Sequence, residues 1–530
     1  MSAEVINRGN VVARNGVVAA SQPLAVSAGL EILRRGGSAA DAAIAVSAVL
    51  CVVEPGASHL GGDAFVITHH ASDKSNLAFN GSGEAPHSAT AERFPNVIDH
   101  HGFRSATVPG LVSTWFAIHE QFGVLPMSDL LAPAIEYAQS GFPANNGFLR
   151  RMKHHLKLYP DTKVFETLGI PTTIELGDLV TQPYLANSLI QISERGRSAF
   201  YAGEIAEKLI NATNGWFNHQ DLLQHHTRVS APLTVSYRDF YVHGQPPPSQ
   251  GMILLEELKI VEGFNLTNLS ESEQIHLMVE AKKLAFEDRY RVLGDPEHLE
   301  VNVEELLSDE HAAKRRAQIS VDKANVQPSK ENQEGSDTTY FLVADRDGNA
   351  LSWIQSVFHG FGASWAIPET GIIMNNRLTG FSLDQKSPNF ITPGKRPAHT
   401  LNAWTITRKD GSLSHVGGTP GANVQVQTNL QLIVNAIDFG LNPQQNAEAP
   451  RWQHLNKPSE TSLNENFDGV LQIEGRYPQE IQADLERKGH SVQRLSDYGH
   501  GSAVQILHVL ENGTYMAGSD PRSEGHAAGI

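Results

Sequence analysis

A polar stretch of the chain changes abruptly into a strongly β-prone one at residue 338. The residues before it, Ser329 to Asp337 (SKENQEGSD), are polar and show no apolar periodicity. The residues after it, Tyr340 to Ala344 (YFLVA), favour a strand. The sequence therefore predicts a strand over residues 338–345, with Thr338 at the point where a loop ends and the strand begins.

A threonine at such a junction is suited to one particular chemistry. Its hydroxyl can attack the preceding peptide bond, Asp337–Thr338, and the α-amine freed by the cut can serve as the base for the same hydroxyl. This is the arrangement of a hydrolase with an N-terminal nucleophile. Threonine is also common at strand starts, so the residue alone favours an ordinary hydrogen-bonded threonine, and further landmarks are needed.

Composition limits the classes of function that the chain can have. Its 530 residues can bury a large core, and 40% are apolar. The formal net charge of −17 argues against a nucleic-acid partner. The lone Cys51 excludes an internal disulfide framework and is expected to be buried. We find no secretory signal and no apolar run long enough to span a membrane, so we expect a cytoplasmic protein.

Periodicity predicts helices and strands that alternate along the chain without a linker between domains. We expect a hairpin over residues 11–20, turning at Asn15-Gly16. Residues 246–251, rich in proline, form a rigid loop. This alternation predicts layers of helices around sheets. The main further elements are helices over 23–35, 39–53, 111–121, 127–139, 185–194, 274–290 and 425–439, and strands over 64–69, 350–358 and 502–510.

Two patterns that resemble metal sites are better explained otherwise. Asp345-x-Asp347-Gly348 lacks the remaining ligands of a calcium loop and fits a hairpin turn. The histidine pairs His69-His70 and His225-His226 lie in no zinc-binding pattern, and we expect them on the surface. No metal site is predicted.

A series of motifs occurs in order along the chain: Gly36–Ala43 (GGSAADAA), Val52–Pro55 (VVEP), Asp337–Thr339 (DTT), Glu369–Ile372 (ETGI), Asn375-Asn376, Pro393–Pro397 (PGKRP), Gly418–Gly421 (GTPG) and Ser519–Arg522 (SDPR). Together these landmarks resemble the γ-glutamyltransferase family of N-terminal-nucleophile hydrolases. The resemblance implies an α+β fold, a four-layer αββα sandwich made as one precursor. Cleavage at Asp337–Thr338 would give fragments 1–337 and 338–530 that stay together as a heterodimer, with no cofactor.

The resemblance also assigns catalytic roles. Thr338 would be nucleophile and base, and Ser356 the hydroxyl that orients it. The family uses the backbone N–H groups of a Gly-Gly pair as an oxyanion hole, and Gly421-Ala422 stand at that place here. Backbone donors survive the change to alanine where the dihedral angles allow it.

The positions that hold the γ-glutamyl group in transpeptidases are changed. Ser82 stands in place of the arginine that binds the α-carboxylate. Phe358, Arg377 with Gly380, and His399-Thr400 replace an asparagine, a Gln–Asp set and a Ser-Ser pair. The acid that would pair with a substrate ammonium is missing at Gly380, and a cation has appeared at Arg377.

These departures are accompanied by a short segment, 383–392, where transpeptidases have a longer segment that forms a lid. Both features make the chain similar to the branch that includes oxamate amidohydrolase and glutathione hydrolase-like proteins. We therefore expect a small amide that bears a carboxylate, oxamate being the best guess. Arg377, helped by His399 and Thr400, would hold the carboxylate, although a structural ion pair of Arg377 is an open alternative. His359 would line the pocket, unless it is a plain loop residue.

Three other functions remain open at this point. The first is a γ-glutamyl hydrolase or transferase acting on glutathione or related compounds. The second is an acylase for β-lactam side chains or other bulky amides. The third is a folded relative without catalysis, in which Asp337–Thr338 stays intact.

Self-cleavage can be tested by mass. Freshly purified protein is expected to show two fragments whose junction is Asp337–Thr338, because the threonine hydroxyl attacks its own peptide bond. Thr338→Ala is expected to stay full-length, as measured by intact-mass spectrometry. A single full-length mass for both proteins would contradict the catalytic interpretation.

Overall fold

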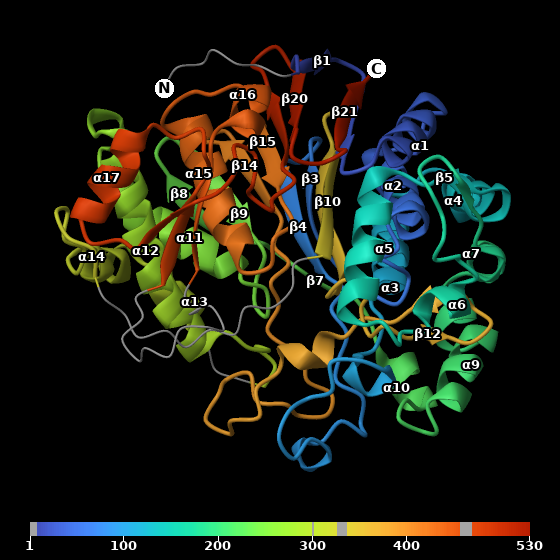
Figure 1. Ribbon diagram of the computed structural model, residues 1–530. Coiled ribbons are helices and arrows are strands. Elements are labelled where there is room, and N and C mark those ends of the chain that lie inside the picture. Colours follow the sequence, from blue (N-terminus) through green and yellow to red (C-terminus); the bar gives the residue numbers. More distant parts are fainter. Residues whose placement is uncertain (1–7, 299–301, 326–336, 456–468) are drawn as a thin grey trace.

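The computed structural model describes residues 8–298, 302–325, 337–455 and 469–530 (Figure 1). Within these residues the chain forms two seven-stranded sheets and three smaller ones. The two large sheets face each other, and helices cover both outer faces (Figure 1). The polar run that precedes Thr338 in the sequence lies mostly outside the described residues.

The first sheet carries the strand that begins at the predicted nucleophile. Its order is β21-β2-β10-β11-β3-β4-β7, and neighbouring strands are antiparallel. The strand predicted from residue 338 is β10, and it lies near the middle of this sheet. The strands are β2 (Gly16–Ala20), β3 (Asp63–His70), β4 (Ser75–Asn80), β7 (Arg228–Ser230), β10 (Asp337–Asp345), β11 (Ala350–Phe358) and β21 (His526–Gly529).

The second sheet has the order β1-β20-β19-β15-β14-β9-β8 and is also antiparallel. Its outer face packs on α11 (Gly251–Glu262), α12 (Glu271–Val292) and α15 (Val424–Ile437). The strands are β1 (Val11–Ala13), β8 (Leu233–Tyr237), β9 (Phe240–Gly244), β14 (Trp404–Arg408), β15 (Leu413–Gly418), β19 (Gln505–Val509) and β20 (Tyr515–Ser519).

The alternation of side chains along β10 shows how the layers are held together. Tyr340, Leu342 and Ala344 lie in the apolar core between the two sheets. Phe341 and Val343 point the other way, into the core between the first sheet and its helices. Because both faces of the strand are buried, its sequence is an almost continuous apolar run. The predicted four-layer αββα sandwich is confirmed.

The helices on the first sheet include α2 (Ala39–Val53), in which every residue is buried. Ser38 caps α2 by accepting the N–H of Asp41, and the Asp41 carboxylate accepts the N–H of Ser38 in return. The same apolar core contains residues of α1 (Pro23–Arg34), α3 (Leu111–Phe122), α4 (Met127–Ser140), α5 (Asn146–Leu158), α6 (Val164–Leu168), α7 (Pro183–Arg195), α8 (Arg197–Tyr201) and α9 (Glu204–Ala212).

Smaller elements complete the described chain. The short strands form the three small sheets, β5-β6, β12-β13 and β16-β17-β18. No helix in the described ranges combines the length and the apolar character that crossing a membrane requires. The remaining elements are α10 (His219–Gln224), α13 (Val303–Leu306), α14 (Asp309–Arg316), α16 (Pro443–Glu448), α17 (Gln479–Arg487), β5 (Phe142–Pro143), β6 (Leu179–Val180), β12 (Ala366–Ile367), β13 (Ile372–Ile373), β16 (Trp452–Leu455), β17 (Val470–Ile473) and β18 (Val492–Arg494).

The hairpin predicted over residues 11–20 is wrong. Both strands exist, but β1 pairs with β20 in the second sheet and β2 with β10 and β21 in the first. The Asn15-Gly16 turn carries the chain from one sheet to the other. At this turn the backbone N–H groups of Arg14 and Asn15 donate to the carbonyl of Ile530, which is distant in sequence. Asn15-Gly16 does form a turn, as its sequence indicates. Pairing with strands that are distant in sequence determines which sheet β1 and β2 each join.

The surface position predicted for two histidines is also wrong. His69 is buried and His225 has a side chain with no exposure. His225 Nδ1 lies 2.7 Å from Glu84 Oε2, so a carboxylate partner compensates for its burial. The predicted turn at Asp345 is confirmed, because its carboxylate accepts the N–H groups of Asp347 and Asn349.

Packing between the sheets can be tested at Leu342, which is fully buried there. Leu342→Ala is expected to lower the free energy of unfolding by about 2–5 kcal/mol, because it leaves a cavity that rigid neighbours cannot fill. Urea unfolding of the purified protein measures the change. Val12→Ala is the control, because Val12 is 62% exposed on β1 and its truncation should cost less than about 0.5 kcal/mol. Equal losses in the two variants would contradict the layered core.

Candidate active site

The predicted nucleophile lies at the start of β10, with its side chain nearly buried. Thr338 is 6% exposed, and its Oγ1 donates to Ser356 Oγ at 3.2 Å on the neighbouring strand β11. Ser356 Oγ also accepts the N–H of Phe358 at 2.8 Å. The next residue, Thr339, is anchored to Ser21 by a hydroxyl contact of 2.6 Å. The hydrogen bonds of Thr338 with Ser356 and of Thr339 with Ser21 thus fix the start of β10. Thr338 and Ser356 are brought together as predicted.

The predicted oxyanion donors lie in the loop between β15 and α15. Gly421 and Ala422 both have positive φ, +134° and +46°. Their carbonyls are used, since Gly421 O accepts from Val424 N and Ala422 O from Gln250 Nε2. Across the described chain, neither of their N–H groups donates to a protein acceptor. Two adjacent unused amides are what an oxyanion hole requires.

The backbone of this loop is strained at Ala422. A left-handed conformation costs a residue with a Cβ about 1–2 kcal/mol relative to glycine. Gln250 offsets this strain by holding the loop, because its Nε2 donates both to Ala422 O at 2.9 Å and to Thr400 O at 2.8 Å. Strain held in place by its surroundings is common at functional sites.

Three charged or ionisable side chains form a buried cluster behind the nucleophile. Arg377 Nε donates to Asp63 Oδ2 at 3.3 Å, and His399 Nε2 donates to the same oxygen at 3.3 Å. His399 Nδ1 accepts the N–H of Leu401, which leaves the proton on Nε2. Arg377 also faces the ring of Phe358 at 4.0 Å. Arg377 therefore forms a structural ion pair with Asp63, which is the alternative that the sequence left open for this residue.

Burial controls the protonation of the histidines at the site. Burial, reinforced by the charge of Arg377, lowers the pKa of His399 from 6.5 to about 4. Burial, with Arg377 and neighbouring histidines, likewise lowers the pKa of His359 to about 4. Both rings are neutral at neutral pH, so neither adds a positive charge to the site.

A cavity of about 680 Å³ opens beside these residues. His359 and Thr400, both predicted from the sequence, lie on its wall, together with Phe358 and Asn423. Arg377 and His399 are 1% and 0% exposed and do not line it. Further lining residues are Asn96, Val97, Ile98, His100, Arg289, Tyr290, Leu293, Thr379, Gly380, Phe381, Ser382, Leu383, Ser387, Pro388, Asn389 and Ala398.

Ser82, the predicted replacement for a substrate-binding arginine, turns inward. It is fully buried and donates through Oγ to Asn80 Oδ1 at 2.6 Å. The adjacent Gly83 N–H donates to Asp63 Oδ1 at 3.1 Å. Ser82 therefore belongs to the turn that supports Asp63 and is not among the cavity residues.

Asp63, Arg289 and Asn423 were not predicted from the sequence. Asp63 carried a signal, since it is an acid at the head of an otherwise apolar strand, where a buried charge needs a partner. Arg289 and Asn423 carried none. They meet only because the end of α12 packs beside the oxyanion loop, where Arg289 Nη2 donates to Asn423 Oδ1 at 2.9 Å.

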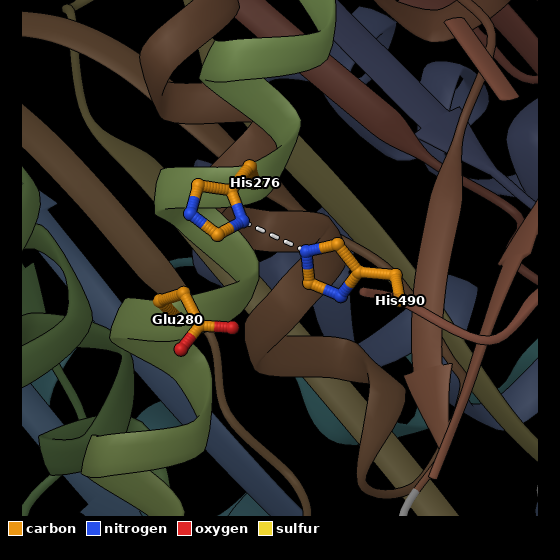
Figure 2. Close-up of side chains that lie close together, drawn as sticks. All are labelled: His276, Glu280 and His490. Atoms are coloured by element: carbon orange, nitrogen blue, oxygen red, sulfur yellow. Dashed lines mark hydrogen bonds between the residues drawn. The ribbon is translucent and has the colours of Figure 1, made fainter. Parts of the chain in front are cut away.

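Away from the cavity, His276, Glu280 and His490 bring metal-ligand atoms within 4.8 Å of one another (Figure 2). His276 Nδ1 lies 2.8 Å from His490 Nε2. The Glu280 carboxylate already accepts from Lys283 Nζ at 2.8 Å and from the N–H of Asn325 at 3.0 Å. Because Lys283 cancels the single negative charge, a dication here would be buried without compensation. The group is better suited to a hydrogen-bonded network.

A second such group consists of Glu256, Asp288 and His311. Burial, with a contribution from Asp288, raises the pKa of Glu256 well above 4.5. Asp288 is bound by Arg315 through Nε at 2.7 Å and Nη2 at 2.6 Å. With the pKa of Glu256 raised and Asp288 paired with Arg315, this group likewise fits a structural network.

Comparisons with known proteins agree along the whole chain. A family model described as gamma-glutamyltranspeptidase matches residues 25–530. The chain is 36% identical to the glutathione hydrolase-like YwrD proenzyme of Bacillus subtilis, over 98% of this chain and 99% of the relative. It is 34% identical to the oxamate amidohydrolase proenzyme of Klebsiella pneumoniae, over 98% and 99%. The structure of cephalosporin acylase from Bacillus halodurans matches with a TM-score of 0.90 and 35% identity, covering 99% and 97%.

The fold and the family match define an N-terminal-nucleophile hydrolase. Within that class, this chain belongs to the gamma-glutamyltranspeptidase family. The resemblance, the fold class and the hydrolase activity predicted from the sequence are confirmed. The three relatives carry three different substrate names, so family membership does not choose among the substrates.

The low pKa of His399 predicts a dependence of stability on pH. The unfolded chain takes up a proton near pH 6.5, whereas the folded ring resists it until about pH 4. Stability is therefore full above pH 6.5 and falls as the pH decreases towards 4. His399→Gln is expected to flatten part of this fall, as measured by thermal unfolding from pH 7.5 to 4.

The control is His70→Gln, because His70 has a side chain that is 37% exposed and lies outside the site. We expect this variant to follow the wild-type pH profile. If His399→Gln lost stability to the same extent as the wild type across this range, the neutral, buried state of His399 would be wrong.

Proposed function

We propose that the chain cuts itself between Asp337 and Thr338 and becomes an amidohydrolase for an amide that bears a carboxylate and lacks an essential α-ammonium. Fragments 1–337 and 338–530 remain together as a heterodimer. The observation that carries the proposal is the charge of the cavity. Its described lining contains no aspartate or glutamate, although the chain has a net charge of −17. A substrate ammonium would lose water there without gaining a carboxylate partner.

The proposed mechanism uses groups that are already in place. After the cut, the free amine of Thr338 takes the proton of its own hydroxyl as Oγ1 bonds to the amide carbon. The N–H groups of Gly421 and Ala422 stabilise the oxyanion. The amine returns the proton to the leaving nitrogen, the C–N bond breaks, and an ester with Thr338 remains. Water then adds to the ester, the acid is released and the hydroxyl is restored, while Ser356 keeps it oriented.

The roles proposed for the pocket residues are refined by the buried cluster. Asp63 balances the charge of Arg377, which is therefore better suited to positioning than to binding a substrate carboxylate directly. Arg377 supports the ring of Phe358, which lines the cavity, and shares Asp63 with His399. Thr400 and His359 remain proposed contacts for the substrate. Oxamate, the smallest amide of this class, is the leading candidate.

A bulkier amide is the second candidate, favoured by the size of the cavity. A volume of about 680 Å³ lies in the range of pockets for drug-sized ligands. An acylase for amides with a large acyl group would use this space. A γ-glutamyl substrate is less well supported, because its ammonium requires an acid.

The substrate can be tested with two assays in parallel. We expect the self-cleaved enzyme to release ammonia from oxamate and to leave a γ-glutamyl anilide nearly untouched, because only the latter requires an ammonium site. Thr338→Ala is the blank for both. Clear anilide turnover without ammonia from oxamate would refute the proposal, and turnover of bulky amides alone would favour the acylase.

The cellular location of the protein and the number of heterodimers in its assembly stay predictions. We propose a cytoplasmic enzyme, which fractionation of the producing cells would test. Size-exclusion chromatography with light scattering would give the number of processed pairs in the assembly.

A further inference from the structure

Two side chains that line the cavity carry a buried polar atom without a hydrogen-bond partner. The atoms are Tyr290 Oη and His359 Nε2, and neither bonds to any residue in the described ranges. Most buried polar groups in proteins are paired, so two such atoms around one cavity indicate a partner that comes from outside the chain. We propose that Tyr290 and His359 hydrogen-bond oxygens of the substrate's acyl group other than the attacked carbonyl. This inference rests on the proposed function.

The tautomer of His359 is set by Asn376. Asn376 Oδ1 accepts the backbone N–H of His359 at 3.1 Å, and Asn376 Nδ2 donates to the carbonyl of His100 at 3.2 Å. These two bonds fix the orientation of the amide, so Nδ2 is also the donor to His359 Nδ1 at 2.7 Å. Because burial lowers the pKa of His359 to about 4, the neutral ring carries its one proton on Nε2. His359 is therefore an uncharged hydrogen-bond donor.

The position of His359 follows from the residues that hold the proposed nucleophile. It comes directly after Phe358, whose N–H donates to Ser356 Oγ, and the same oxygen accepts the hydroxyl of Thr338. The ring of His359 also stacks on the ring of His100, which lines the cavity too, with centres 6.1 Å apart. The donor is thus held in place beside the strand end that carries the catalytic hydroxyls.

Tyr290 approaches from the other fragment, at the side of the oxyanion loop. It belongs to the last turns of α12, and its ring lies 5.7 Å from the guanidinium of Arg289. Arg289 donates to Asn423, the residue after Ala422. The two donors therefore flank the place of the reacting carbonyl. Residues 1–337 supply one donor and residues 338–530 supply the other, so both products of the proposed cut complete the site.

This pair of donors defines a class of substrate. A neutral N–H or O–H can bond to a carboxylate oxygen or to a ketone oxygen, and the bond to the charged oxygen is the stronger. An acyl group made only of hydrocarbon would leave both donors buried and unpaired, and sites built to form hydrogen bonds reject such analogues strongly. We therefore expect selection for amides whose acyl group carries oxygen beside the attacked carbonyl.

The experiment uses self-cleaved full-length enzyme and measures ammonia release from three amides. Oxamate has two further oxygens, the neutral pyruvamide has one, and isobutyramide has methyl groups in their place. In Tyr290→Phe and in His359→Phe we expect kcat/KM for oxamate to fall about 10- to 100-fold, because each variant loses a hydrogen bond to a charged group. The fall for pyruvamide should be smaller, because its oxygen is uncharged.

Isobutyramide should respond to neither substitution, because it offers no oxygen to either donor. Where its turnover is too slow to follow, its inhibition constant against oxamate replaces kcat/KM. Comparing each variant with the wild type on the same amide cancels the different intrinsic reactivities of the three compounds. His359→Gln keeps an N–H donor in the side chain and should recover part of the loss seen in His359→Phe.

The matched control is Tyr241→Phe, which removes the hydroxyl of a tyrosine on β9. Tyr241 is 42% exposed and does not line the cavity, so the kcat/KM values should equal those of the wild type. Intact mass and thermal unfolding establish that each variant is folded and cut.

The possible outcomes separate the inference from the function on which it rests. Suppose that the wild type hydrolyses oxamate and that a substitution affects oxamate and isobutyramide by the same factor, or affects neither. That side chain then holds no substrate oxygen, the inference fails for it, and the proposed function stands. If the wild type releases ammonia from none of the three amides, the proposed function fails and the inference fails with it.

Discussion

The geometry of the active site depends on one close contact between the two large sheets. Gly418, the last residue of β15, lies against the ring of Tyr340, and a Cβ at Gly418 would come within 2.4 Å of Tyr340 Cε2. Tyr340 follows Thr338 by two residues, and Gly418 precedes Gly421 by three. Because the glycine allows the sheets to approach, the strand that carries the proposed nucleophile and the loop that carries the proposed oxyanion donors converge. A larger residue would push apart the two halves of the catalytic site.

Several of the landmarks that identify the family belong to the frame of the molecule. Arg396 donates through Nε to Glu84 at 2.8 Å, and Arg522 donates to Glu474 and Asp520. These pairs are buried, so losing one partner would leave a charge without compensation. Such motifs specify a fold and do not determine what the cavity binds, and the relatives that match this chain carry different substrate names.

The difference between motifs that specify the fold and residues that line the cavity also explains which features could be predicted from the sequence. The alternation of helical and strand patterns predicted layers of helices around sheets, and the resemblance to the family implied that there are four layers. The pair Thr338 and Ser356 followed from family motifs on adjacent strands. The actual partners of β1 and β2, the pair of Asp63 with Arg377, and the pair of Arg289 with Asn423 all join residues that are far apart in sequence and near in space. Local patterns do not encode such contacts. The proposed substrate contacts His359 and Thr400 were predicted from the sequence, whereas Asp63 beside Arg377 could be located only in the structure.

The crossing of the chain at Asn15-Gly16 has a consequence for the proposed cut. In the first sheet, β2 lies between β21 and β10, so a strand from before residue 338 is enclosed by two from after it. In the second sheet, β1 pairs with β20 at one edge and β9 pairs with β14 near the other. The two products would therefore be interwoven through both sheets. Separating them would require unzipping backbone hydrogen bonds in each sheet, so a broken peptide bond would leave a single cooperative folding unit.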